Sequence, residues 1–507
     1  MKKTMLTVLV TILVSISVSA QMPGQVKIQV HDLTTKEDKL SVVTAMEKEI
    51  TSISNNASSE KSKKKRFTSI QKITKSIQDK FPVKGMSETG IIINEATYIV
   101  LKNATIIDGV SDIGKKGTLF IKDDKIETID YSNNRQVPKG AIIYNLEGKY
   151  IIPGLIDGHT HVTHGTLKEA QEKLYTALKN GVTSVRELGG DGRMLTLLKK
   201  NMQIGEDIGP DIFFSTIIAG SEFFDNDPRP ASVAKGAKAG QASWQTAITH
   251  KSDLRQVIAE AKGLGATAIK VYMSVGNKLF KKVVKEAKRQ KLMVWSHAVV
   301  PPTKALDITN GGSQVLSHAA DMIPYEFLEG DVKSRYSMSR KEVRAYRKEL
   351  AAIKWDANSF EVKRLFNAMK NNNSILDATL FIYYYSSRKM RKMKPEELGK
   401  EDLFRAVRIA HNMGVKIGAG TDHMISKGYI INIHKEIELL TIAGLSNIEA
   451  LRSATIINAE AMGEKKNIGT IENGKLANLL VLNANPLEDI TQTKNIKFVI
   501  KRGKVID

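Results

Sequence analysis

The middle of this 507-residue chain alternates short apolar segments with amphipathic helical patterns, which strongly limits the folds it can adopt. The segments that resemble buried strands are 151–156, 183–188, 211–218, 268–273, 293–297, 314–318, 375–381 and 416–421. Helical patterns between them include 167–179, 254–264, 278–289 and 403–412. Eight such units favour an α/β fold, a (β/α)8 TIM-like barrel with its chemistry at the C-terminal ends of the strands. A doubly wound open sheet would show the same alternation, but the count of eight and the placement of polar residues favour the barrel.

Short β patterns flank this middle section on both sides. Segments 98–101, 105–107, 117–121 and 125–129 precede it, and segments 469–482 and 496–505 follow it. Turn residues such as Asp123-Asp-Lys separate the strands. We therefore expect a small composite β-sandwich domain built from residues 97–150 and 463–507, with the barrel at 151–462.

The first 96 residues have a different character. Met1-Lys-Lys precedes a mostly apolar run from Leu6 to Val18, and the small residues up to Ala20 are typical of a cleaved signal peptide at 1–20. The run is short for a membrane span, although an uncleaved anchor is the alternative. Residues 21–96 form a polar extension whose role the sequence leaves open. We expect an exported protein, periplasmic or secreted, without stable membrane insertion.

Composition bears on the choice of partner. The chain has 76 Lys and Arg against 54 Asp and Glu, and such an excess raises the question of nucleic-acid binding. The densest basic block, 61–66, lies in the polar extension and contains no aromatic residue on which bases could stack. A lysine-rich solvated surface explains the charge better, so no nucleic acid is expected. The expected partner is a small-molecule substrate, and a homo-oligomer is possible.

Side chains that can bind metal recur where the predicted strands end. They are His159 and His161 on the first strand, Lys270 on the fourth, His297 on the fifth, His318 on the sixth and Asp422 on the eighth. His159 and His161 are two residues apart, so in extended backbone both imidazoles point to the same side. Four imidazoles and a carboxylate exceed what one tetrahedral catalytic metal needs, and six ligands shared by two metals fit better. Lysine is an unusual ligand because its ammonium is a cation at neutral pH.

These residues resemble the amidohydrolase superfamily. The resemblance covers residues 97–507 and is carried by Pro153-Gly-Leu-Ile-Asp-Gly-His-Thr-His161 together with the later histidines, Lys270 and Asp422. The most similar subgroup is the imidazolonepropionase-related enzymes, which include exported prolidase-like and dipeptidase-like members. The resemblance implies two divalent metal ions, zinc being the expected metal, and a carbamate formed from Lys270 and carbon dioxide. True imidazolonepropionases and deaminases use one metal and lack this lysine, so Lys270 favours the binuclear branch.

The resemblance also implies a role for each residue. His159, His161 and Asp422 would hold the more buried ion, His297 and His318 the more exposed one, and the Lys270 carbamate would bridge them. A hydroxide between the ions would attack a carbonyl carbon, and Asp422 would pass its proton to the leaving nitrogen. This would make the protein an amidohydrolase that cleaves a C–N bond, with dipeptides or N-acyl amino acids favoured. The alternatives are a hydrolase of cyclic amides or lactones, and a catalytically inactive binding or scaffold relative.

Several of these residues also have a plausible structural role, and the sequence offers further candidates for the site. His297 and His318 could be core histidines, Lys270 an ion-pair partner and Asp422 a helix cap. The candidate substrate contacts are Tyr272 and His423, although Tyr272 could merely pack. Arg186 and Glu187 are predicted to pair with each other, and His164 to support the site or lie in a loop.

Overall fold

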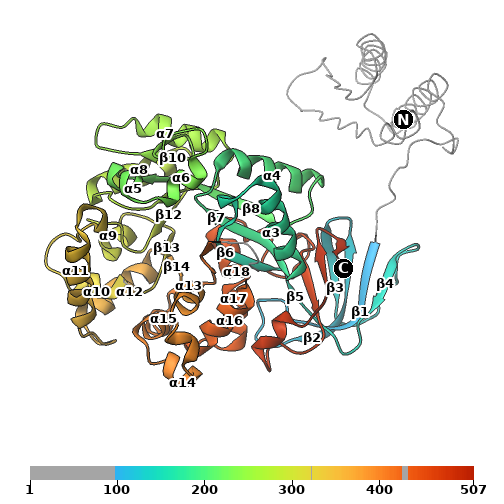
Figure 1. The fold of residues 1–507 in the computed structure, drawn as a ribbon. Helices are drawn as coiled ribbons and strands as arrows, with labels where there is room; N and C mark the ends of the chain where they lie inside the picture. Colours follow the sequence, from blue (N-terminus) through green and yellow to red (C-terminus); the bar gives the residue numbers. More distant parts are fainter. Residues whose placement is uncertain (1–97, 321, 425–431, 507) are drawn as a thin grey trace, which may run out of the picture. The chain divides into compact units, whose positions relative to one another are not determined.

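The computed structural model describes residues 98–320, 322–424 and 432–506. The predicted signal peptide at 1–20 and the polar extension at 21–96 lie outside these residues. Within them, no helix combines the length and the apolar character that a membrane span requires. The strands form two sheets, one that joins both ends of the described chain and one that contains a barrel (Figure 1).

The first of these, here called the terminal sheet, runs in the order β19-β18-β17-β5-β1-β2-β3, with β4 paired to β1. Its strands are β1 (Tyr98–Ile106), β2 (Lys115–Lys122), β3 (Lys125–Asp130), β4 (Ile142–Asn145), β5 (Tyr150–Pro153), β17 (Leu479–Leu482), β18 (Ile496–Lys501) and β19 (Lys504–Ile506). Apolar side chains from both chain ends, among them Leu101 and Val481, form one buried cluster. Backbone hydrogen bonds between Ile126 and residues 474–475 bring β3 back to the C-terminal segment, so the sheet encloses its own core.

The second sheet contains eight parallel strands in sequence order, which confirms the predicted barrel. They are β6 (Leu155–His161), β7 (Val182–Leu188), β8 (Asp211–Ala219), β11 (Ala268–Val271), β12 (Met293–His297), β13 (Val315–Ser317), β14 (Ile375–Asp377) and β15 (Lys416–Gly418). Beyond β15 the chain reaches β16 (His423–Met424), which pairs with β6 and closes the ring. At this closure the Gly158 N–H donates to the Ala419 oxygen over 2.9 Å. A Cβ on Gly158 would lie 2.8 Å from that oxygen, so only glycine fits.

Helices surround the barrel strands (Figure 1). The longer ones are α3 (Leu167–Lys179), α4 (Gly192–Ile204), α7 (Leu254–Gly263), α8 (Asn277–Arg289), α11 (Arg340–Ala352), α12 (Phe360–Asn371), α15 (Asp402–Asn412) and α16 (Ile433–Ile442). The shorter elements are η2 (Val162–His164), α5 (Ser221–Asn226), α6 (Arg229–Ala234), β9 (Gln241–Ala242), β10 (Gln245–Ala247), α9 (Ala305–Asn310), α10 (Met322–Glu326), η3 (Arg335–Ser337), α13 (Leu380–Ser386), η4 (Met390–Lys392), α14 (Pro395–Leu398), α17 (Asn447–Ser453), α18 (Ile456–Ala461) and η5 (Ile490–Lys494). Helix α3 illustrates how the local sequence specifies a helix and its buried face. Thr166 and Glu169 cap it reciprocally, and its buried Ala170, Leu174 and Ala177 recur every three or four residues.

The first predicted barrel strand, 151–156, is divided between the two sheets. Residues up to Pro153 belong to β5, which pairs with β17 in the terminal sheet, and β6 begins at Leu155. The break falls at Gly154, where an added Cβ would lie 2.3 Å from the Thr183 hydroxyl on the neighbouring strand. A continuous apolar run gives no sign of such a change of partner, because both halves are buried.

The seventh predicted strand, 375–381, is too long. Strand β14 ends at Asp377, Thr379 has a left-handed backbone with φ 51°, and helix α13 begins at Leu380. The buried Glu436 carboxylate accepts the backbone N–H groups of Leu380 and Phe381, at 3.1 and 2.6 Å. These donors have no partner inside the helix, so a carboxylate distant in sequence fixes where it starts.

A buried ion cluster joins the terminal sheet to the barrel. Asp211, at the start of β8, accepts Arg502 Nη2 over 3.0 Å and also accepts the Lys501 ammonium, where β18 ends. Burial alone would raise the pKa of the Asp211 carboxyl, but the two cations outweigh burial and lower it. The Asp211 and Lys501 side chains are only 7% and 10% exposed, so either one would be costly to leave unpaired.

We expect Asp211→Asn to lower the free energy of unfolding by about 3–5 kcal/mol at pH 7, because it leaves the buried Lys501 ammonium without its counter-charge. The folded-state pKa of Asp211 is depressed, so its stabilisation is present above the ordinary value of 3.8 and is lost as pH falls further. Denaturant unfolding should therefore show a gap between wild type and variant that narrows below pH 3.8. Glu147→Gln, which breaks an exposed pair with Lys116, is the matched control and should change stability little. Equal effects of the two substitutions would contradict the prediction.

Candidate active site

The six side chains predicted as metal ligands gather at the C-terminal ends of the barrel strands. They are His159 and His161 on β6, Lys270 on β11, His297 at the end of β12, His318 directly after β13 and Asp422 after β15. All are buried or partly buried. Because the strands are parallel, their C-terminal ends meet at one end of the barrel, as the sequence led us to expect.

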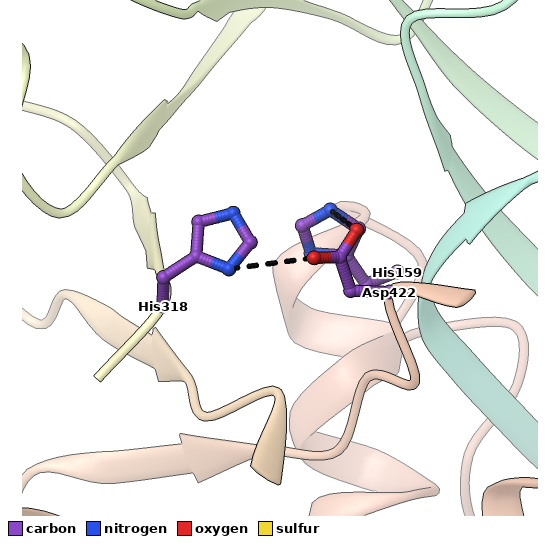
Figure 2. A group of neighbouring side chains, drawn as sticks. All are labelled: His159, His318 and Asp422. Atoms are coloured by element: carbon purple, nitrogen blue, oxygen red, sulfur yellow. Dashed lines mark ion pairs between the residues drawn. The ribbon is translucent and has the colours of Figure 1, made fainter. Parts of the chain in front are cut away.

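Asp422 lies between three imidazoles. Its Oδ1 is 3.2 Å from Nε2 of His159 and 3.2 Å from Nε2 of His161, and its Oδ2 is 3.7 Å from Nδ1 of His318. Figure 2 shows the contacts of the Asp422 carboxylate with His159 and His318. The candidate ligand atoms of these three residues all lie within 4.8 Å of one another. Imidazole nitrogens and a carboxylate oxygen this close suit a transition metal, so the residues present fit such an ion.

The protonation states agree with this donor set. Burial lowers the pKa of His318 to about 3 despite the nearby Asp422, and it lowers the pKa of His159 as well. Burial would raise the pKa of Asp422, but its contacts with His159, His161 and His318 hold it well below its usual range. The His159 and His318 imidazoles are therefore neutral and the Asp422 carboxylate is ionised, and these are the forms that coordinate metals.

Two of these residues occupy backbone conformations that are strained for a side-chain-bearing residue. His318 has φ 76° and Asp422 has φ 47°. Each is held by a backbone hydrogen bond to the neighbouring strand, from the His318 N–H to the Asp377 carbonyl oxygen over 3.0 Å and from the Asp422 N–H to the His159 carbonyl oxygen over 2.9 Å. Left-handed backbone of this kind persists where the surroundings enforce it and is often found at functional sites.

His297 has a buried nitrogen, Nδ1, without a hydrogen-bond partner among the described residues. Its ring centroid lies 4.6 Å from that of His318 and 4.0 Å from that of Tyr272. Burial lowers the pKa of His297 well below its ordinary value, so the ring is neutral. A core histidine normally satisfies its buried nitrogens, so the unpaired atom favours a ligand role over a packing role.

Lys270 is completely buried in the same barrel end. Its ammonium donates to the Ser317 hydroxyl over 2.7 Å and to the Ser296 carbonyl over 3.2 Å. Burial and, next, the charge of Arg186 lower the pKa of Lys270 to about 7. No ion pair with a carboxylate is formed by Lys270 in the described part of the chain, so the structural ion-pair alternative finds no support there.

A buried network orients the His159 ring. Asp377 Oδ2, at the end of β14, lies 2.7 Å from His159 Nδ1 and accepts Arg186 Nη2 over 2.8 Å. Arg186 also donates to the Gly158 carbonyl and lies over the Trp295 ring, 4.9 Å from its centroid. With Nδ1 directed at Asp377, His159 presents Nε2 to Asp422. The carboxylate thus fixes which ring nitrogen faces the candidate metal position.

The predicted Arg186–Glu187 ion pair is wrong. Arg186 pairs with Asp377, whereas the Glu187 carboxylate accepts the Val162 N–H over 3.0 Å and the Thr160 hydroxyl over 2.8 Å. The physical reason is the pleat of β7, which directs consecutive side chains to opposite faces.

Asp157, within the Pro153–His161 motif, links β6 to the segment that follows β15. Its carboxylate accepts the His159 N–H over 3.1 Å, the Thr421 N–H over 3.0 Å and the Thr421 hydroxyl over 2.8 Å. These bonds join β6 to the segment that carries Asp422. The motif showed this aspartate, but its partner lies 264 residues away in sequence.

The secondary candidates differ in their placement. Tyr272 is 9% exposed and lies against His297, so it borders the site. The backbone of His423 pairs with Thr160, and its side chain lies outside what the structure describes. His164 is in η2, with its ring 5.9 Å from that of His161 and its Nδ1 2.8 Å from the Ser232 hydroxyl.

Comparison with known proteins agrees with this architecture. A model described as "Amidohydrolase family" matches residues 150–506. An adenine deaminase of Methanocaldococcus jannaschii is 32% identical over 92 residues, so the alignment spans 17% of this chain and only 16% of that relative. A 5-methylthioadenosine/S-adenosylhomocysteine deaminase of Clostridium tetani is 22% identical over 445 residues, 80% of this chain and 93% of that protein. A solved structure of a Xaa-Pro dipeptidase with bound methionine covers 81% of this chain and 100% of its own at 20% identity and a TM-score of 0.62, which shows a shared fold.

Proposed function

Because this chain belongs to the amidohydrolase family, a group of hydrolases acting on carbon–nitrogen bonds, we propose that it cleaves an amide or peptide-like bond with the help of two divalent metal ions. The observation that carries this proposal is the convergence of three imidazoles, those of His159, His161 and His318, on the Asp422 carboxylate, at 3.2, 3.2 and 3.7 Å. Dipeptides or N-acyl amino acids are the favoured substrates.

The proposal assigns the donor set to two positions. His159 and His161 present Nε2 to Asp422 and would hold the more buried ion together with it. His318 and the unpaired Nδ1 of His297 would serve the second ion. Lys270 reaches the same barrel end from β11, and as a carbamate it would add an anion between two cations, where an ammonium would repel them.

Bound ions of this kind polarise a carbonyl oxygen and lower the pKa of a water molecule, which supplies the nucleophile. The chain's own contribution to the proton steps is Asp422. Its carboxylate would accept the proton released as water attacks and pass it to the leaving nitrogen. Asp377 and Arg186 would keep the His159 ring in the orientation that leaves Nε2 facing the site.

The choice of substrate draws on two comparisons. The structural neighbour is named a Xaa-Pro dipeptidase, and the family match supports amide bonds in general. The two relatives named deaminases favour a rival activity, the removal of an amino group from a purine base or nucleoside. Lys270 on the fourth strand argues for the binuclear branch. The proposal includes export, which rests on residues 1–20 alone, and zinc as the metal.

The test is metal removal followed by titration. Chelator-treated protein is expected to lose hydrolysis of a panel of Xaa-Pro dipeptides, Xaa-Arg dipeptides and N-acyl amino acids. Activity should return as the bound zinc, manganese or cobalt approaches two equivalents, measured by elemental analysis. Lys270→Met should bind fewer than two equivalents and keep its fold.

Each other outcome has a definite meaning. Turnover of hydantoins or lactones without any peptide or N-acyl substrate would replace the favoured substrates with cyclic ones. Less than one equivalent of metal, with no turnover of any of these compounds, would identify an inactive relative. Ammonia release from adenine or methylthioadenosine at one equivalent would point to a deaminase.

A further inference from the structure

A cationic and aromatic cluster lies beside the candidate metal residues. It consists of Asp227, Arg229, Arg335 and Tyr336, here called the Arg229 cluster. Arg229 donates Nη2 to Asp227 Oδ2 over 2.6 Å and Nε to Asp227 Oδ1 over 2.9 Å. The Tyr336 hydroxyl donates to Asp227 over 2.6 Å, and Arg335 Nη2 donates to that hydroxyl oxygen over 2.6 Å. These contacts join the α5–α6 segment, which follows β8, to η3, which follows β13.

The Arg229 cluster has an unbalanced positive charge. Two guanidinium groups share the single Asp227 carboxylate, at 2.6 and 3.9 Å. Burial would raise the pKa of Asp227, but hydrogen bonds from Arg229 and Tyr336 lower it to about 2. The carboxylate is therefore ionised and contributes one full negative charge to the cluster. One positive charge remains without a partner inside the cluster. The Arg229 and Arg335 side chains are 37% and 44% exposed, so a ligand can reach them while Asp227 stays buried beneath.

Tyr272 connects this charge to the metal residues. Its ring lies 4.0 Å from the His297 ring on one side, and the Arg229 guanidinium carbon lies 6.0 Å from its centroid on another. Added together, these two distances put the Arg229 guanidinium at most about 10 Å from the centre of the His297 ring. For comparison, one residue of extended chain spans about 3.5 Å, so a substrate of one or two residues can bridge this distance. A group held by Arg229 while a carbonyl sits at the metal residues would therefore be close to the bond that is cut.

The position of Arg229 is fixed in advance by its short helix. In α6, the Val233 carbonyl accepts the Trp244 indole N–H over 2.9 Å, and the Pro230 carbonyl accepts the Gln245 amide over 3.0 Å. Ser232 contacts His164, which follows the His159–His161 strand. A guanidinium held this firmly binds a planar anion with little loss of conformational freedom.

We propose that the Arg229 cluster binds the carboxylate of the substrate, so that the enzyme selects amides whose leaving amino acid has a free carboxylate next to the scissile bond. Arg229 is then a specificity-determining residue. The Arg229 cluster would then recognise the C-terminal carboxylate of a dipeptide, and an N-acyl amino acid, which has the same carboxylate but no free amine, would be accepted as well. This inference rests on the proposed function for the reaction itself but concerns binding.

The experiment compares L-leucine, the amino acid that such a substrate would release, with L-leucinamide by calorimetric titration of the metal-loaded protein, since neither contains the acyl bond that would be cut. Wild type is expected to bind the acid at least about tenfold more tightly than the amide, since charge-assisted hydrogen bonds are the stronger kind. Arg229→Met should remove this preference by weakening the acid alone. Arg335→Gln should reduce it in part and leaves the buried Arg229–Asp227 pair intact, so it provides the test if the first variant does not fold. Arg344→Gln, an exposed arginine on α11, controls for net charge and should keep the full preference.

Kinetics with acid and amide forms of an accepted dipeptide separate the two proposals. Arg229→Met should raise KM for the acid with little change in kcat. Acid-selective binding that Arg229→Met abolishes, without any hydrolysis, would support this inference and count against the proposed function. Hydrolysis of acid and amide with equal efficiency, or equal weakening of both by Arg229→Met, would overturn the inference and leave the function standing.

Discussion

Asp422→Asn is expected to reduce kcat/KM by at least about 10³-fold while the protein keeps its fold, since a positioned proton-transfer group alone is worth 10²–10⁴-fold. The asparagine is nearly isosteric, but it removes the negative charge that lies 3.2 Å from both His159 and His161. It would therefore weaken the proposed buried metal position and remove the proposed proton acceptor together. Steady-state kinetics on the best substrate, elemental analysis and thermal unfolding of the same preparation provide the three readouts.

The matched control is Asp402→Asn, at the exposed start of α15. Its side chain is 64% exposed and its contact is with Arg405, so kcat/KM should stay within about twofold of wild type. Retention of more than a tenth of wild-type kcat/KM by Asp422→Asn would show that another group moves the proton. Such a result would also contradict the proposed role of Asp422 as a metal ligand.

Asp377→Ala is expected to lower the free energy of unfolding by about 3–5 kcal/mol, because it leaves the Arg186 guanidinium buried without its counter-charge. The Arg186 and Asp377 side chains are 1% and 2% exposed, so water cannot take over the lost contact. The same substitution frees the His159 ring at Nδ1, so metal affinity should fall about 10–100-fold. Denaturant unfolding of the metal-free protein and competition with a chelator measure the two effects separately.

The double variant with Arg186→Met shows whether the pair acts as a unit. Removing both charges leaves no isolated ion, so the double variant should be more stable than the sum of the single losses predicts, by about 0.5–3 kcal/mol. Metal affinity should not recover with it, because His159 still lacks its acceptor. Strict additivity of the two unfolding energies would mean that Arg186 and Asp377 stabilise the fold independently.

The sequence predicted those parts of the site that repeat with the fold. A polar residue at the end of a barrel strand can be recognised from the strand pattern, so the sequence alone predicts that His159, His297, His318 and Asp422 lie at one end of the barrel. Their roles as ligands remain a prediction. Lys270 was located in the same way, and the structure adds its burial and its serine partners.

What the sequence missed depends on which side chains meet across the barrel. Asp377 also ends a strand, but its contacts with His159 and Arg186 span 218 and 191 residues. No local spacing in the sequence indicates such pairs. For Arg186 the sequence suggested the adjacent Glu187 as partner, and this prediction was wrong. The Arg229 cluster could not be predicted either, because no pattern in the sequence places the α5–α6 segment after β8 beside η3 after β13.

The pairing of β5 with β17 has a consequence for how the protein is made. Leu479 lies opposite Pro153, so the whole barrel must be synthesised between the two partners. During translation, β1 and β5 leave the ribosome long before the strands that complete their sheet, and their apolar faces must wait exposed. Contacts between residues so far apart in sequence form slowly, and the pairing of β16 with β6 in the barrel is long-range as well. The terminal sheet can therefore be completed only after the whole barrel segment and β17 have been synthesised.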